Sequence, residues 1–277
     1  MNARSALFDL YGDHLRERGG KAPIAALVRL MSALGIAAPA VRTAVSRMVR
    51  QEWLEPVRLP RGAGYALTPR AARRLDEAAH RIYRDLGPWD GRWHLLVVER
   101  VRERARRDRL TAGLGYLGYA RLDDTTWISP RPSSELDPLL DAESARAERF
   151  LSVYEGDPHG LVARAWDLEG LARAYERWLA DARALLAGDP APSDERAFAV
   201  RSRLVHEWRK FLFRDPGLPP AVLPPGWPGM LAARFFDAEA ARLLPAASRF
   251  VEGCLEDTLE KIPGETAPRG DEEDDDV

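Results

Sequence analysis

The sequence predicts an α+β protein of several domains, and three observations lead to this fold class. Apolar residues recur at helical spacing in the first fifty positions and again after position 160. Between them, residues 93–99 form a continuous apolar run of strand length, and strand-like and helical segments alternate up to residue 154. The chain of 277 residues exceeds one small domain, and its hydrophobic content of 45% is enough to bury a core in each part.

Three helices are predicted at the start of the chain. Their expected ranges are 3–18, 23–34 and 39–50. Gly19–Gly20 ends the first helix and Gly35 ends the second, because glycine adopts the left-handed conformation that closes a helix. Pro23 and Pro39 suit the first turns of the second and third helices. The second and third helices, joined by a short turn that contains Gly35, have the helix-turn-helix arrangement.

A hairpin and a fourth helix are predicted next. Residues 53–59 have strand character, residues 60–64 form a turn, and residues 65–67 return as a strand. Thr68–Pro69 begins the fourth helix, because threonine caps a helix and proline fits its first turn. The hairpin corresponds to the wing of a winged helix-turn-helix domain.

The third helix has one apolar and one polar face. The apolar arc contains Val41, Ala44, Val45, Met48 and Val49. The polar arc, which carries no acid, consists of Arg42, Thr43, Ser46, Arg47 and Arg50. Arginine forks bind phosphate or guanine edges, and hydroxyls bind phosphate oxygens. A basic surface helix without a partner is an equal alternative from this helix alone, but the turn before it and the hairpin after it favour a DNA major groove. Arg58 and Arg61 of the hairpin are then expected to contact the DNA backbone or the minor groove.

Charge is distributed unevenly along the chain. Residues 1–85 hold 15 Lys and Arg against 8 Asp and Glu, a net charge of +7, although the whole chain carries only -2. Residues 265–277 hold seven acids and one arginine. The basic N-terminal part fits a polyanionic partner, and the acidic end, which is poor in apolar residues, is expected to be disordered.

The middle and C-terminal parts differ in their patterns. After a turn-rich boundary at 86–91, the order strand, helix, strand, helix, strand predicts a ferredoxin-like α/β sandwich. Later helices are expected at 168–186, 195–213, 230–243 and 245–262. We therefore expect a winged helix-turn-helix domain at 1–86, a ferredoxin-like domain at 92–160, a helical domain at 161–262 and a disordered acidic tail at 263–277.

Composition and motifs give little support to other classes of function. The single cysteine, Cys254, is expected to be buried and excludes a disulfide framework within the chain. No apolar signal region or run of about 18 apolar residues is present, so a cytoplasmic location without membrane contact is expected. The sequence Gly113–Gly118 matches a dinucleotide motif but lacks the preceding strand, and a helix end with a loop is the expected structure.

Catalytic and metal-binding residues are not expected. The five histidines are scattered, and His206–Glu207 is followed by Lys210 where a second zinc ligand would stand, so His206 is expected to be structural. The alternative function is a metal-dependent nuclease or nucleic-acid-processing protein that uses the middle domain, with Glu99 as its one candidate ligand. The arginine-rich segment 100–109 fits either an anion-binding surface or a solvated amphipathic helix.

Several segments together resemble one family. They are ARSALFDLYGD at 3–13, RGG at 18–20, VRTAVSRMVRQEWL at 41–54, YALT at 65–68, WDGRW at 89–93, WDL at 166–168 and LVHEWRKFLFRDPGLP at 204–219. In this order they resemble the PaaX-like family of phenylacetate-degradation repressors. The resemblance implies the three domains given above, with a middle domain similar to that of a small CRISPR-associated nuclease family.

The resemblance also implies a function. It is that of a homodimer that represses an operon for aromatic-acid catabolism. A pair of winged domains is expected to bind an inverted-repeat operator in double-stranded DNA, and the absence of catalytic motifs predicts a non-enzymatic regulator. Release from DNA would come from phenylacetyl-CoA or a related acyl-CoA as effector, with no cofactor. The sequence assigns no effector-binding residues.

Overall fold

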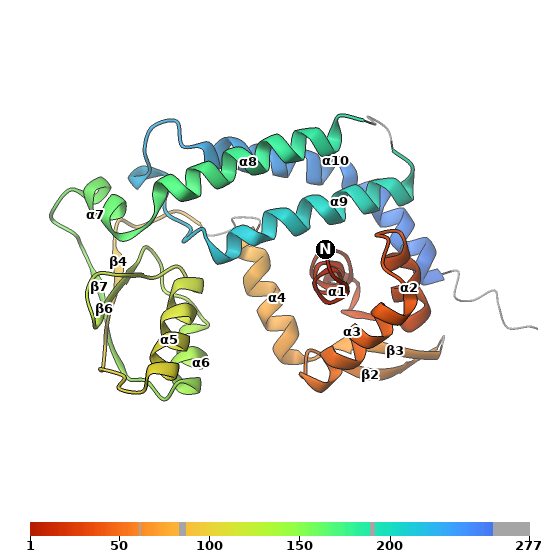
Figure 1. Ribbon diagram of the computed structural model, residues 1–277, viewed down its shortest axis with the longest axis horizontal. Coiled ribbons are helices and arrows are strands. Elements are labelled where there is room, and N and C mark those ends of the chain that lie inside the picture. Colours follow the sequence, from red (N-terminus) through yellow and green to blue (C-terminus); the bar gives the residue numbers. More distant parts are fainter. Residues whose placement is uncertain (61, 83–86, 189–191, 257–277) are drawn as a thin grey trace, which may run out of the picture.

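The computed structural model describes residues 1–60, 62–82, 87–188 and 192–256, apart from the side chains of residues 77 and 80–82. Within these ranges the chain is mixed helix and sheet, which confirms the predicted α+β class. A layer of long helices spans the molecule, and two smaller units lie on one side of it (Figure 1). Arg61 and the tail 263–277, both named in the sequence predictions, lie outside the described residues.

The N-terminal unit contains the predicted helix-turn-helix. Helix α1 (Ala3–Leu10) continues through a π turn, η1 (Tyr11–Leu15), and a 3-10 turn, η2 (Arg16–Arg18). Helices α2 (Ile24–Ser32) and α3 (Ala38–Arg50) follow, and α4 (Pro69–Ile82) leaves the unit toward the middle of the molecule (Figure 1). One core holds α1, α2 and α3 together, with Leu7, Leu27 and Met48 fully buried.

The sheet of this unit differs from the prediction in two respects. Strands β2 (Leu54–Leu59) and β3 (Gly62–Leu67) pair directly, so the turn predicted at 60–64 is too long. A third strand, β1 (Lys21–Pro23), was missed, and the strand order is β1-β3-β2. The close pairing depends on Gly64, because a Cβ there would lie 2.8 Å from the backbone oxygen of Ala22.

The middle unit has the predicted ferredoxin-like order. Its elements are β4 (Trp93–Val98), α5 (Arg104–Tyr116), β5 (Ala120–Arg121), β6 (Thr126–Ser129), α6 (Leu136–Ala142) and β7 (Ala147–Ser152). All pairings are antiparallel in the order β5-β6-β4-β7. Helices α5 and α6 cover one face through a shared apolar core, and α7 (Pro158–Ala165) packs with residues of the other face.

The C-terminal region forms the long helical layer. Helix α8 (Leu168–Leu186) lies beside α9 (Asp194–Trp208), which continues as the 3-10 helix η3 (Arg209–Phe213). A loop containing η4 (Pro220–Val222) leads to α10 (Pro228–Glu256). The helix break predicted before Pro245 is wrong, because α10 continues through this proline. The helix packs into three apolar clusters along its length, and these contacts hold it continuous despite the missing N–H.

The N-terminal unit and the helical layer share one core. Phe198 of α9 and Ala247, Val251 and Cys254 of α10 belong to the same apolar cluster as α1, α2 and α3. Cys254 is buried, as predicted. Within the described part of the chain, no helix is both long and apolar enough to cross a membrane.

Candidate nucleic-acid interface

Helix α3 presents the predicted face to the surface. Its inner side chains, Val41, Ala44, Val45 and Met48, are at most 6% exposed and fix the rotation of the helix. The five polar residues predicted to bind DNA from this helix, Arg42, Thr43, Ser46, Arg47 and Arg50, are all exposed. The structure therefore brings them together on one side of α3, directed away from the domain core.

This face carries positive charge that the surrounding protein leaves uncompensated. The Arg50 Nη1 atom lies 3.4 Å from Ser46 Oγ, which gives it a contact along the same face. Among the described residues, no acid forms an ion pair with Arg42 or Arg47. Guanidinium groups held on a rigid helix without internal carboxylate partners remain available to a polyanion.

The turn before α3 sets the direction of the helix. Gly35 has a φ of 76°, and the N–H of Ile36 donates to the carbonyl of Met31 over 3.0 Å. Ala37 is the N-cap and has no side chain that could accept a hydrogen bond from the first turn. The uncapped N–H groups at this end are the part of a helix that attracts anions. The partial positive charge of these N–H groups adds to the positive charge of the arginine side chains on α3.

The hairpin lies beside α3 at the same edge of the molecule (Figure 1). Arg58 on β2 is exposed, as the prediction requires, whereas Arg61 lies outside the described residues. The sequence reasoning missed Arg70 at the start of α4, whose guanidinium carbon lies 5.8 Å from the centroid of the Trp53 ring. Stacking on Trp53, next to the start of the hairpin, places a further exposed cation at this edge, and only the fold brings the two residues together.

Three family models match successive parts of the chain. A model described as PaaX-like protein matches residues 2–71, and the PaaX protein central Cas2-like domain matches residues 86–160. The PaaX-like protein C-terminal domain matches residues 166–253. The chain belongs to the PaaX-like family. The resemblance inferred from its sequence segments is thereby confirmed.

Two relatives of this PaaX-like chain are informative. The transcriptional repressor PaaX of Escherichia coli K12 is 29% identical over 277 aligned residues, covering 95% of this chain and 87% of the repressor. The solved structure of the uncharacterized protein Rv0674 from Mycobacterium tuberculosis has a TM-score of 0.61 and 25% identity. It covers 91% of this chain and 98% of its own, so the similarity extends over the whole architecture.

Two predictions about the Cas2-like unit and the helical layer are confirmed. Gly113–Gly118 lies at the C-terminal end of α5 and in the loop after it, as expected for a helix end and not for a dinucleotide site. His206 is structural, because its Nδ1 atom lies 2.7 Å from Asp9 Oδ2 at the contact between α9 and α1.

The basic segment 100–109 is tied into the Cas2-like unit of the PaaX-like chain. Arg109 donates to the carboxylate of Glu143 over 2.9 Å, and Arg106 donates to the backbone oxygens of Glu143 and Ser144. Arg100 and Arg104 form exposed ion pairs with Asp124 and Asp108. These contacts favour the amphipathic-helix interpretation over an anion-binding surface.

The nuclease alternative depends on Glu99 at the end of β4. Glu99 is exposed, and Arg100 follows it directly. Among the described residues, no three His, Cys, Asp or Glu side chains gather where they could hold a metal ion. A divalent cation needs several oxygen ligands, so the geometry at Glu99 gives the nuclease hypothesis no support.

Proposed function

We propose that this chain is a DNA-binding transcriptional repressor that uses α3 as its recognition helix. The observation that carries the proposal is the exposed, acid-free face of α3 in a winged helix-turn-helix unit. Membership of the PaaX-like family and the name of the Escherichia coli relative support the same function. The repressor acts in the cytoplasm, where bacterial DNA is accessible to it.

The proposed binding mode divides the contacts into two kinds. Arg42 and Arg47 read base edges in the major groove, and the hydroxyls of Thr43 and Ser46 position the helix on phosphates. Arg50 belongs to the same major-groove face, and the hairpin residues Arg58 and Arg61 contact the DNA backbone or the minor groove. Because phosphate contacts release counterions, affinity for DNA is expected to fall steeply with salt, while base contacts determine the sequence that is preferred.

A homodimer suits the proposed mode of DNA binding best. A homodimer would place two α3 helices on an inverted repeat, with half-sites about one helical turn of 34–36 Å apart or a multiple of it. A change in the spacing of the two helices would then change operator affinity without any change in α3 itself. This provides a physical basis for control by a ligand bound elsewhere.

The proposed regulation is release by an aryl-CoA thioester, in an operon for the breakdown of aromatic acids such as phenylacetate. The family name supports this pathway, and phenylacetyl-CoA is the first effector to test. Such a ligand would act by favouring one arrangement of the DNA-binding units over the other.

The binding test compares two double variants. An operator sequence is first selected from a random DNA pool by the wild-type protein, and its retention is then measured by gel retardation. Arg42→Ala with Arg47→Ala should abolish specific retention while the melting temperature stays close to wild type, because both side chains are exposed. Arg173→Ala with Arg183→Ala on α8 removes the same charge far from α3 and should bind normally. Equal retention by the two double variants would refute the recognition-helix assignment.

A further inference from the structure

A large cavity lies where the middle unit meets the helical layer. Its volume is about 510 Å³, and its lining comes from the end of α5, the segment 129–133, the loop 215–220 and the first turns of α10. This volume is within the range of small-molecule sites and exceeds the roughly 150 Å³ that holds a benzene ring. None of the residues proposed to contact DNA lines it.

One wall of this cavity consists of aromatic rings. The Tyr175 and Phe211 rings stack with centroids 4.0 Å apart, and Trp208 lies 5.2 Å from Phe211. Trp227 meets Tyr175 edge-on at 6.4 Å. Aromatic rings prefer stacked and edge-on neighbours, so a planar aromatic group is the ligand that this wall suits. The lining also carries charged side chains of both signs, namely Arg131, Arg234, Asp215 and Asp237.

The end of α5 and the loop 215–220, which both contribute to the lining, are in close backbone contact. Gly118, with a φ of 89°, follows α5, and a Cβ at this position would lie 2.8 Å from the backbone oxygen of Pro216. The facing loop contains Pro216, Pro219 and Pro220, which restrict its backbone. The loop that lines the cavity is therefore held in place by this contact and by its prolines.

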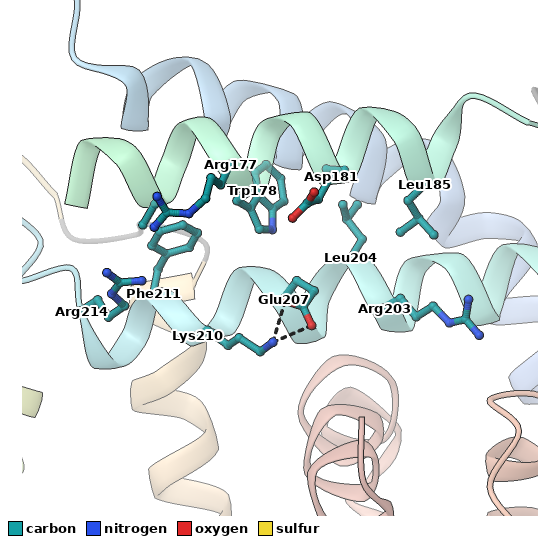
Figure 2. A pocket seen from close by; sticks show the side chains of 12 residues that line it. Arg177, Trp178, Asp181, Leu185, Arg203, Leu204, Glu207, Lys210, Phe211 and Arg214 are labelled. Atoms are coloured by element: carbon teal, nitrogen blue, oxygen red, sulfur yellow. Dashed lines mark hydrogen bonds and ion pairs between the residues drawn. The ribbon is translucent and has the colours of Figure 1, made fainter. Parts of the chain in front are cut away.

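A smaller hollow of about 190 Å³ shares the lining residue Phe211 with the cavity. Figure 2 shows this groove between α8 and the helix formed by α9 and η3, with Arg177 and Arg214 near the Phe211 ring. Lys210 also lines the groove and is paired with Glu207 over 2.6 Å. Among the described residues, no acid pairs with Arg177 or Arg214. This end of the groove suits phosphate groups.

We propose that the two hollows form one effector site, with an aromatic acyl group in the cavity and the anionic part of its thioester along the groove. The assignment rests on the proposed function, because it locates the ligand of a ligand-released repressor. Phe211 of η3 lines both hollows, so a ligand that occupies both contacts η3.

The same segment contacts the DNA-binding unit. Arg209, at the start of η3, has its Nε atom 2.5 Å from Asp9 Oδ1 of α1, and α1 shares its core with α3. On the other side of the cavity, Arg131 donates to the backbone oxygens of Gly87 and Pro88 in the segment before β4. A ligand that shifts η3 would thus act on α1, and through it on α3.

The test uses the full chain, isothermal titration calorimetry and three probes. Phenylacetyl-CoA fills both hollows, CoA alone fits the groove, and the truncated thioester S-phenylacetyl-N-acetylcysteamine fits the cavity. Met230→Trp narrows the cavity from an exposed lining position, and Leu231→Trp is its matched control, because Leu231 is exposed but does not line the cavity. Ala233→Phe fills the cavity from a second position. Arg177→Gln with Arg214→Gln alters the groove, with Arg173→Gln as control.

We expect the cavity variants and the groove variant to weaken the binding of different probes. Met230→Trp and Ala233→Phe should weaken binding of the two aryl thioesters at least tenfold and leave CoA binding unchanged. The double arginine variant should weaken phenylacetyl-CoA and CoA but leave the truncated thioester unchanged, and both controls should match wild type. Wild-type affinity for phenylacetyl-CoA in Met230→Trp and Ala233→Phe, or no binding of any aryl thioester by the wild type, would overturn the proposal.

Operator binding measured without ligand tests the proposed repressor function independently of the proposed effector site. All folded variants of the two hollows should retain the selected operator as the wild type does, because none of the changed residues lies on α3 or the hairpin. If the wild type selects no operator from the DNA pool, the repressor assignment fails, whereas the titrations still decide whether the two hollows bind the thioester.

Discussion

The helical layer contacts the other two units in contrasting ways. Toward the N-terminal unit it is closely packed through a shared apolar core. Arg201 pairs with Asp13 of η1, Arg209 pairs with Asp9 of α1, and His206 forms a hydrogen bond with Asp9. Toward the middle unit it leaves a cavity of about 510 Å³. A dense contact with specific ion pairs transmits a displacement, whereas a cavity can receive a ligand. If the proposed effector site is correct, a ligand binds next to the middle unit and its effect reaches the DNA-binding unit through α1.

The largest effect is expected at the buried ion pair of the dense contact. Arg201 donates to both carboxylate oxygens of Asp13 over 2.7 and 2.9 Å, and both side chains are 4% exposed. Asp13→Ala removes the carboxylate that faces a buried guanidinium and should lower the free energy of unfolding by about 3–5 kcal/mol. Urea denaturation measures this change.

A double variant provides the control for this prediction. Asp13→Leu with Arg201→Met replaces both charges by apolar groups and should restore stability close to wild type, since a hydrophobic pair avoids the cost of desolvating two ions. A double variant as unstable as Asp13→Ala would show that the loss arises from packing and not from an uncompensated charge.

A smaller effect is expected at the edge of the cavity. Gly118→Ala forces a side chain into a left-handed backbone and against Pro216, and should cost about 1–3 kcal/mol in unfolding free energy. Gly115→Ala is the matched control, because it is helical with open space around its Cβ, and it should stabilise the chain by roughly 0.5–1 kcal/mol. Equal stability of the two variants would mean that the contact between Gly118 and the loop is unimportant.

The smallest expected effect is the pH dependence of stability that arises from His14, at the contact between the N-terminal unit and the helical layer. His14 is buried beside Asp13, Arg201, Arg18 and Phe198, and burial, aided by the two arginines and opposed by Asp13, lowers its pKa below the usual 6.5. The unfolded chain therefore takes up a proton at this histidine before the folded chain does. The contribution of His14 to the free energy of unfolding is complete above about pH 6.5. It is lost as the pH falls from there through the lowered pKa, by at most about 1.4 kcal/mol per pH unit.

Thermal unfolding between pH 7.5 and 5.5 measures this dependence. His14→Gln should reduce the slope without abolishing it, because burial also lowers the pKa of His94 in the middle unit. Burial raises the pKa of Asp9 from 3.8, so that group acts with the opposite sign and stabilises the folded chain as the pH falls through its raised pKa. The comparison of His14→Gln with wild type isolates the histidine, and identical slopes would contradict its buried, neutral state.

Local patterns explain which parts of the fold were predictable. The rotation of α3 follows from five apolar residues at helical spacing, and the ferredoxin-like order follows from alternating segments within 60 residues. The strand β1 has three residues and pairs with β3 about 40 positions later, so no local period reveals it. A proline normally ends a helix, and at Pro245 only the packing of α10 into three apolar clusters overrides this tendency.

The proposed effector site was not predictable for a related reason. Its lining comes from segments separated by more than 100 residues, and no single motif marks it. Likewise, Asp9 and His206 are 197 positions apart, so their contact depends on how the units meet. The recognition face could be inferred because one helix carries it, whereas the site and its coupling belong to the tertiary structure.

One measurement tests most directly whether a ligand at η3 controls the DNA-binding unit through α1. It is the ratio of operator dissociation constants with and without saturating phenylacetyl-CoA, compared between wild type and Arg209→Gln, which removes the charge facing Asp9. For the wild type we predict a ratio of about 5–150, the usual range for coupled sites. For Arg209→Gln we predict a ratio close to one, with each ligand still bound on its own. An unchanged ratio in Arg209→Gln would contradict the account.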